Sequence, residues 1–261
     1  MQVSERILVK IIKMNLTRDS IWILLRKVTV PASTGSLFMT FYNLVDTYFA
    51  GMISPEALAA IAKSWPIYFV AMAVAIGIQA GTQALISNSI GAKENRQASL
   101  YVAQSLSFAI VVSIFVTMFG LNFSEHLLKI MGSTEDSIVL TQKYLDIIFY
   151  GSIIILVQLS LNGTLTAQGD TKSYRNVLIF SFFINIFLNP LFIYGYGLIP
   201  AFGIAGLAIA TLVAQGLSVL YLAYKVYRCK LKRFLFPECF IPKFHYLKNL
   251  IIQSVPIMFT M

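Results

Sequence analysis

The chain has 261 residues, of which 57% are hydrophobic and 12% charged, and its formal net charge is +9. Soluble domains average about 25% charged residues, so this composition excludes a soluble protein. The apolar stretches reach about 20 residues or more, enough for helices that cross about 30 Å of hydrocarbon, and they lack the alternation of a membrane β-barrel. We therefore predict an all-α, polytopic membrane protein.

Basic residues are spread over short loops that border the apolar stretches, and they do not form one clustered surface. This distribution argues against a nucleic-acid partner and predicts contacts with the headgroups of anionic membrane lipids. The two cysteines, Cys229 and Cys239, have no second His or Cys pair nearby, so the sequence does not indicate a metal site. Because no nucleophile elbow, phosphate-binding loop or His-rich motif is present, we expect neither an enzyme nor a bound cofactor.

The chain divides into four predicted segments. Residues 1–27 combine basic and apolar side chains and are expected to lie as an amphipathic segment on the cytoplasmic face of the membrane. Residues 28–228 are predicted to form a lobe of six transmembrane helices, followed by a basic cytoplasmic linker at 229–248. Residues 249–261 would reach only about 20 Å as a helix, so we interpret them as the start of a seventh span. The predicted spans lie at about 28–52, 57–89, 98–121, 140–167, 176–194 and 204–224.

The charges between the spans predict the orientation of the lobe. Every loop rich in Lys and Arg falls on the side of both ends of the lobe, whereas the loop 194–203 has no charge. By the positive-inside rule both ends of the lobe are cytoplasmic, in a multi-pass protein of the inner or plasma membrane. Val255-Pro256 follows a basic stretch, as Val30-Pro31 does, which favours an internal repeat and the first half of a twelve-helix transporter.

Asp46 is the first candidate functional residue, because it is a carboxylate near the end of the first apolar run. An Asp at the centre of a membrane helix costs about 2.5 to 3.5 kcal/mol on insertion scales, so such residues usually face a polar interior or an ion path. In the fifth span, Asn185 and Asn189 are four residues apart and project from one helix face. Their amides either join helices by hydrogen bonds or belong to a site.

The depth of these residues in the membrane favours a common site. At about 1.5 Å per residue, Asp46, Asn185, Asn189 and Thr211 all fall in the middle to outer part of the bilayer. Converging carboxylate, amide and hydroxyl oxygens suit a small hard cation, or a proton on the carboxylate.

Three further residues are candidates for the lining of a cavity near Asp46. They are Tyr42 and Asn43, which precede it in the same span, and Lys63 in the second span. Lys63 either extends to the lipid headgroups or pairs with Asp46, and such a pair would weaken the case for a cation site.

These loops and polar positions resemble those of the multidrug and toxic compound extrusion (MATE) family of cation-coupled exporters. The resemblance covers residues of about 28 to 215. It is carried by Pro31, Tyr42–Gly51, Ala57–Ile61, Gly91–Lys93, Ala167–Asp170, Asn185–Gly195 and Gly203–Thr211.

The resemblance implies a fold of two six-helix lobes, of which this chain holds the first and a C-terminal six-helix lobe is the partner. It also implies alternating access, with sodium or proton influx driving the export of small amphipathic organic compounds. In such exporters a cation site is formed by residues that match Asp46, Asn185 and Thr211. Asn189 departs from the pattern, because the family has an acid there, so Asp46 would carry the single negative charge.

Two other functions compete with cation-coupled export. One is a flippase for lipid-linked oligosaccharides or polysaccharides with a related architecture, for which a more cationic central cavity is expected than Lys63 alone provides. The other is a membrane scaffold that transports nothing, in which the polar residues serve packing alone.

Overall fold

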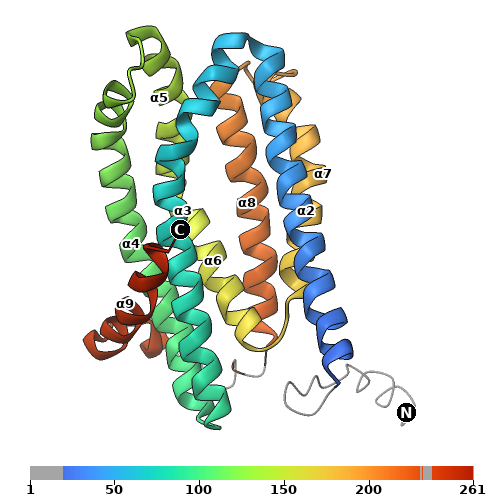
Figure 1. Ribbon diagram of the computed structural model, residues 1–261, viewed down its shortest axis with the longest axis vertical. Helices are drawn as coiled ribbons and strands as arrows, with labels where there is room; N and C mark the ends of the chain where they lie inside the picture. Colours follow the sequence, from blue (N-terminus) through green and yellow to red (C-terminus); the bar gives the residue numbers. More distant parts are fainter. Residues whose placement is uncertain (1–19, 230, 232–236, 261) are drawn as a thin grey trace.

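The structure, a computed structural model, describes the chain except for residues 1–19, 230, 232–236 and 261. Most of the predicted amphipathic segment and part of the predicted linker therefore lie outside the described residues. The described residues form helices and no strand, as predicted for an all-α protein (Figure 1). The elements are α2 (Ile21–Ile53), α3 (Pro55–Gly91), α4 (Asn95–Ile130), α5 (Glu135–Tyr150), α6 (Ser152–Ala167), α7 (Lys172–Tyr194), α8 (Ile204–Tyr227), the short η2 (Pro237–Phe240) and α9 (Phe244–Met258).

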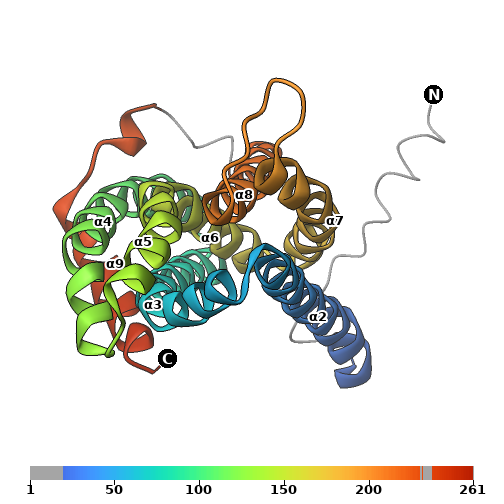
Figure 2. The same ribbon diagram turned by 90° about the horizontal axis from the view of Figure 1, so that it is seen from above.

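Five of the six predicted spans meet a test of length and apolar composition. Among the described residues, α3, α4, α7 and α8 each pass it, and α5 and α6 pass it together as a pair bent by 49°. The helix α2 has 33 residues and is about 50 Å long, but its Ser, Thr and Asn residues and Asp46 make it more polar. It lies alongside α7 in the bundle, as Figure 2 shows from above.

The third and fourth spans differ in detail from the prediction. The helix α4 continues to Ile130 through residues that the sequence predicts to form a loop, and Lys129 and Glu125 pair one turn apart in this part at 2.6 Å. The predicted fourth span is broken at Gly151. A Cβ atom at this glycine would collide with the side chain of Leu212 on α8, so the bend accompanies close packing between the two helices.

Local signals explain where α3 begins and how α7 turns into α8. Ser54 caps α3, since its Oγ accepts a hydrogen bond of 3.1 Å from the Ala57 N–H group, and Pro55 occupies the first turn. After α7, Gly195 has a φ of 75°, and a Cβ atom there would lie 2.7 Å from the Ile199 carbonyl oxygen. A residue with a side chain would be strained in this turn.

The small residues of α3 receive α9. The sequence predicts that Gly77 and Gly81 allow close approach of helix backbones, and the structure identifies the partner. A Cβ atom at Gly77 would lie 2.9 Å from the Ser254 carbonyl oxygen, and one at Gly81 would lie 3.3 Å from the Leu250 carbonyl oxygen. Ser254 and Leu250 are both fully buried. The first helix after the predicted linker is therefore packed tightly onto the six-helix lobe.

A buried glutamine of α4 holds the segment between α8 and α9. Gln104, which is fully buried, donates through Nε2 to the carbonyl oxygens of Cys239 and Ile241, both at 2.7 Å. Its Oε1 accepts from the Lys243 N–H group at 2.8 Å. These bonds fix the described part of the predicted linker against α4, directly before α9.

Candidate functional site

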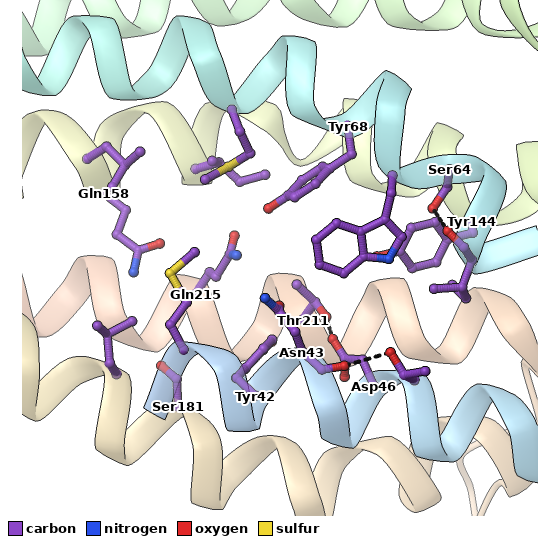
Figure 3. Close-up of a pocket in the computed structure, with 18 of the residues that line it drawn as sticks. Tyr42, Asn43, Asp46, Ser64, Tyr68, Tyr144, Gln158, Ser181, Thr211 and Gln215 are labelled. Atoms are coloured by element: carbon purple, nitrogen blue, oxygen red, sulfur yellow. Dashed lines mark hydrogen bonds between the residues drawn. The ribbon is translucent and has the colours of Figure 1, made fainter. Parts of the chain in front are cut away.

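The lobe encloses a cavity lined by side chains of α2, α3, α5, α6, α7 and α8. Its volume is about 90 Å³, which is room for several water molecules. Among the described residues that line it, Asp46 is the one with a charge. Polar lining residues, labelled in Figure 3, are Tyr42, Asn43, Asp46, Ser64, Tyr68, Tyr144, Gln158, Ser181, Thr211 and Gln215.

Asp46 is contacted by side chains from two other helices. The Nδ2 atom of Asn189 on α7 donates a hydrogen bond of 2.8 Å to its Oδ1. The hydroxyl of Thr211 on α8 donates a longer bond of 3.4 Å to its Oδ2 (Figure 3). Both carboxylate oxygens are therefore engaged, and neither partner carries a charge.

Asn185 completes the cluster from the turn of α7 that precedes Asn189. Its Oδ1 accepts a hydrogen bond of 2.8 Å from the same Asn189 Nδ2 atom. Both asparagines are fully buried. Among the described residues, Asn185 Nδ2 and Asn189 Oδ1 have no hydrogen-bond partner. The cluster thus contains a buried acceptor and a buried donor that remain unsatisfied, an arrangement that carries an energetic cost.

The structure links the four residues predicted to form the site by hydrogen bonds, from Asn189 to Asp46 and Asn185 and from Thr211 to Asp46. The spacing of four residues brings both amides to one face of α7, and depth alone placed Asp46 and Thr211 at their level. The bond from Asn189 to Asp46 also joins α7 to α2, so this amide links two helices and contacts the carboxylate of the predicted site.

Of the three predicted lining residues, Tyr42 and Asn43 line the cavity and Lys63 does not. Lys63 Nζ donates a hydrogen bond of 2.9 Å to Ser137 Oγ, at the start of α5. In the structure it does not pair with Asp46, so the ion pair that would have weakened a cation site is not formed.

Sequence reasoning missed the polar residues on the other side of the cavity. Tyr68 of α3, Gln158 of α6 and Gln215 of α8 direct their polar ends into the same space (Figure 3). The two glutamines stand in the middle of apolar helices, and a carboxamide in hydrocarbon needs hydrogen-bond partners. That signal, which singled out Asn185 and Asn189, was present for Gln158 and Gln215 as well.

The donor set of the cluster fits a small hard cation. Such ions prefer oxygen ligands, and the cluster offers the Asp46 carboxylate, the Asn185 Oδ1 atom and the Thr211 hydroxyl. The unpaired Oδ1 atom of Asn189 would add a further oxygen if its amide rotated. The described residues contain no group of three or more His, Cys, Asp or Glu side chains of the kind that holds a transition metal.

Known proteins that resemble the chain are membrane transporters. A FAD transporter of Shewanella oneidensis is 30% identical over 188 residues, which cover 72% of this chain and 42% of that protein. A probable multidrug resistance protein of Bacillus subtilis is 28% identical over 199 residues, which cover 76% and 43%. The chain spans less than half the length of these two relatives.

Solved structures give the same result. The outward-facing structure of a multidrug resistance MATE family transporter of the MOP superfamily superimposes with a TM-score of 0.80 at 27% identity, over 90% of this chain and 52% of that one. This agrees with the predicted six-helix lobe of a twelve-helix fold. The profile of the MatE family matches residues 31–191. The chain therefore belongs to the MatE family of multidrug and toxic compound extrusion transporters.

Proposed function

We propose that the complete protein exports amphipathic organic compounds by alternating access, driven by the inward flow of sodium ions or protons. In this proposal the chain is the N-terminal lobe and holds the coupling site. The observation that carries it is the position of Asp46, which is the one charged side chain among the described residues that line the cavity. It lies within hydrogen-bonding distance of Asn189 and Thr211.

The proposed site holds one positive charge at a time. A cation would be bound by oxygen atoms of Asp46, Asn185 and Thr211, and a proton would reside on the Asp46 carboxylate. Either one neutralises a carboxylate that lies inside the membrane, where an uncompensated charge is unfavourable. Binding and release of one positive charge therefore change the electrostatics of the lobe, as coupling requires.

We place the organic substrate mainly outside this cavity, between the lobe and a second lobe. Sites for drug-sized ligands measure about 300–1,000 Å³, whereas this cavity measures about 90 Å³. One relative is named a FAD transporter and another a probable multidrug resistance protein, so the names of the relatives point to different compounds. Aromatic cavity walls such as Trp65, Tyr68 and Tyr144 suit the flat apolar part of such a molecule if the cavity widens during transport.

The charged residues bear on the orientation of the lobe in the membrane and on the alternative functions. The Lys and Arg residues of the loops support cytoplasmic ends of the lobe in the plasma membrane. A flippase for lipid-linked oligosaccharides is less well supported, because in the part of the chain that the structure describes neither Lys nor Arg lines the cavity. The relatives are transporters, which supports a protein without catalytic activity.

The test is Asp46→Asn in the full protein as its gene encodes it, reconstituted into liposomes. We expect ion-driven transport of a fluorescent organic cation to fall to background, because the variant can no longer bind and release a charge. The matched control is Asp146→Asn. It also removes a carboxylate from a membrane helix, but Asp146 is not among the residues that line the cavity. Unchanged ion-driven transport by Asp46→Asn would overturn the proposal.

A further inference from the structure

The amide nitrogen of Asn189 lies between two oxygens that a cation would need. Its Nδ2 atom is 2.8 Å from Asp46 Oδ1 and 2.8 Å from Asn185 Oδ1. Both oxygens accept hydrogen bonds from its two N–H groups, which supply partial positive charge. The N–H groups thus stand where a bound cation would contact the same two oxygens.

The orientation of this amide follows from its neighbours. With the amide reversed, Asn189 Oδ1 would face both the Asp46 carboxylate and Asn185 Oδ1, with no hydrogen between three oxygens. Such an arrangement is repulsive unless a positive charge lies among them. In the observed orientation, Asn189 Oδ1 is buried without a partner in the described part of the chain. A bound cation would be coordinated by that oxygen.

We propose that the side-chain amide of Asn189 takes the place of the coupling cation in the ion-free lobe, and that a cation binds as this amide turns its oxygen toward Asp46. The inference rests on the proposed cation coupling at Asp46 and assigns Asn189 as the residue that limits cation affinity. Each binding event has to break two hydrogen bonds of 2.8 Å, one of them to a carboxylate. Cation binding is therefore weaker than the number of oxygens suggests.

The neighbouring asparagine provides a matched test, since both residues are buried on one face of α7 but present opposite ends of their amides. Asn189→Asp replaces the inward N–H groups by oxygen and adds a negative charge. Asn185→Asp adds the same charge where an oxygen already faces the cluster. Added charge alone would strengthen cation binding similarly in both variants, whereas removal of an obstructing N–H group occurs in Asn189→Asp alone.

The measurement is calorimetric titration of the full protein in detergent with sodium chloride at a mildly alkaline pH, with choline chloride as the control salt. We expect Asn189→Asp to lower the Kd for sodium about tenfold more than Asn185→Asp does, a difference that corresponds to about 1.4 kcal/mol. An equal increase in sodium affinity in both variants, or a larger increase in Asn185→Asp, would overturn the inference.

Thermal unfolding provides a second readout that does not depend on calorimetric signal. Without sodium, Asn189→Asp should lower the melting temperature, because oxygens then face each other around Asp46. Addition of sodium should raise the melting temperature of Asn189→Asp by more than it raises that of Asn185→Asp. Equal increases in the two variants would contradict the inference. A failure of the proposed function gives a different result. In that case Asp46→Asn would bind sodium as tightly as the unmodified protein does, whatever the sodium affinities of the two asparagine variants.

Discussion

Asn189 and Asp46 are 143 positions apart in the chain, and the amide nitrogen of one lies 2.8 Å from a carboxylate oxygen of the other. The second contact of the carboxylate, from Thr211, is 3.4 Å long. Hydrogen bonds between oxygen atoms are usually about 2.5–3.0 Å long, so the contact from Thr211 is weak. Asp46 is thus held mainly by α7 and only loosely by α8.

This inequality predicts different losses of stability for two substitutions. Thr211→Val keeps the shape of the side chain and removes the long bond, so we expect the free energy of unfolding to fall by less than about 0.5 kcal/mol. Asn189→Leu removes two short bonds, one to a carboxylate, and should cost about 1.5–3 kcal/mol. Thermal unfolding in detergent, without sodium, measures both values. Similar losses for the two variants would show that Thr211 holds the carboxylate as firmly as Asn189 does.

The contact between α3 and α9 predicts opposite effects for two Gly→Ala substitutions. In Gly81→Ala the new methyl group would meet the Ser254 backbone nitrogen at 3.2 Å, and we expect a loss of about 1–3 kcal/mol from overpacking. Gly216→Ala adds the same methyl group to α8 at a position where, among the described residues, no atom beyond the helix's own nearby backbone lies within 4 Å. It should stabilise the protein by roughly 0.5–1 kcal/mol, because Ala is a better helix former than Gly.

The melting temperatures of the two glycine variants check this prediction. A rise for Gly216→Ala together with a fall for Gly81→Ala would locate the effect at the α3–α9 contact. A neutral Gly81→Ala would mean that α9 moves away from α3 at little cost, and that its docking contributes little to stability.

The candidate site could be predicted from the sequence because its residues are polar exceptions in apolar helices. The helical rise gives their depth, and the spacing of four residues gives the common face of Asn185 and Asn189. Depth alone does not assign Gln158 and Gln215 to the same cavity. A helix that is apolar on most sides leaves its rotation about its own axis undetermined, so which side faces the interior depends on packing against neighbours.

Two features of the fold depend on contacts between distant residues. The break at Gly151 coincides with packing against Leu212, and neither residue differs locally from many others in membrane helices. Gly77 and Gly81 predicted a close helix contact, but the identity of the partner, α9, depends on the path of the chain after α8. Gln104 contributes to that path, because it binds backbone groups more than 130 positions away.

Gln104 therefore provides the last prediction, which concerns the segment before α9. Gln104→Leu keeps a buried side chain of similar size but leaves the carbonyl oxygens of Cys239 and Ile241 without the Gln104 donor. We expect a cost of about 1–3 kcal/mol for these groups, and the segment should detach from α4 to regain hydrogen bonds with water. Cys239, whose exposed fraction is 8%, is a natural reporter of detachment because its thiol becomes accessible when the segment leaves.

The measurement is the rate of maleimide labelling of Cys239 in the full protein, with Cys229 replaced by Ser. Gln104→Leu should raise this rate about tenfold, as expected for a loss of about 1.4 kcal/mol in the closed state. Ser107→Ala removes one hydrogen bond to this segment, of 2.7 Å to the Phe240 carbonyl oxygen, and should raise the labelling rate less than Gln104→Leu does. In a protein that retains Cys229 and carries Cys239→Ser, Gln104→Leu should leave labelling unchanged, because Cys229 is already partly exposed. Equal rates at Cys239 with and without Gln104 would show that packing, rather than this glutamine, holds the segment on α4.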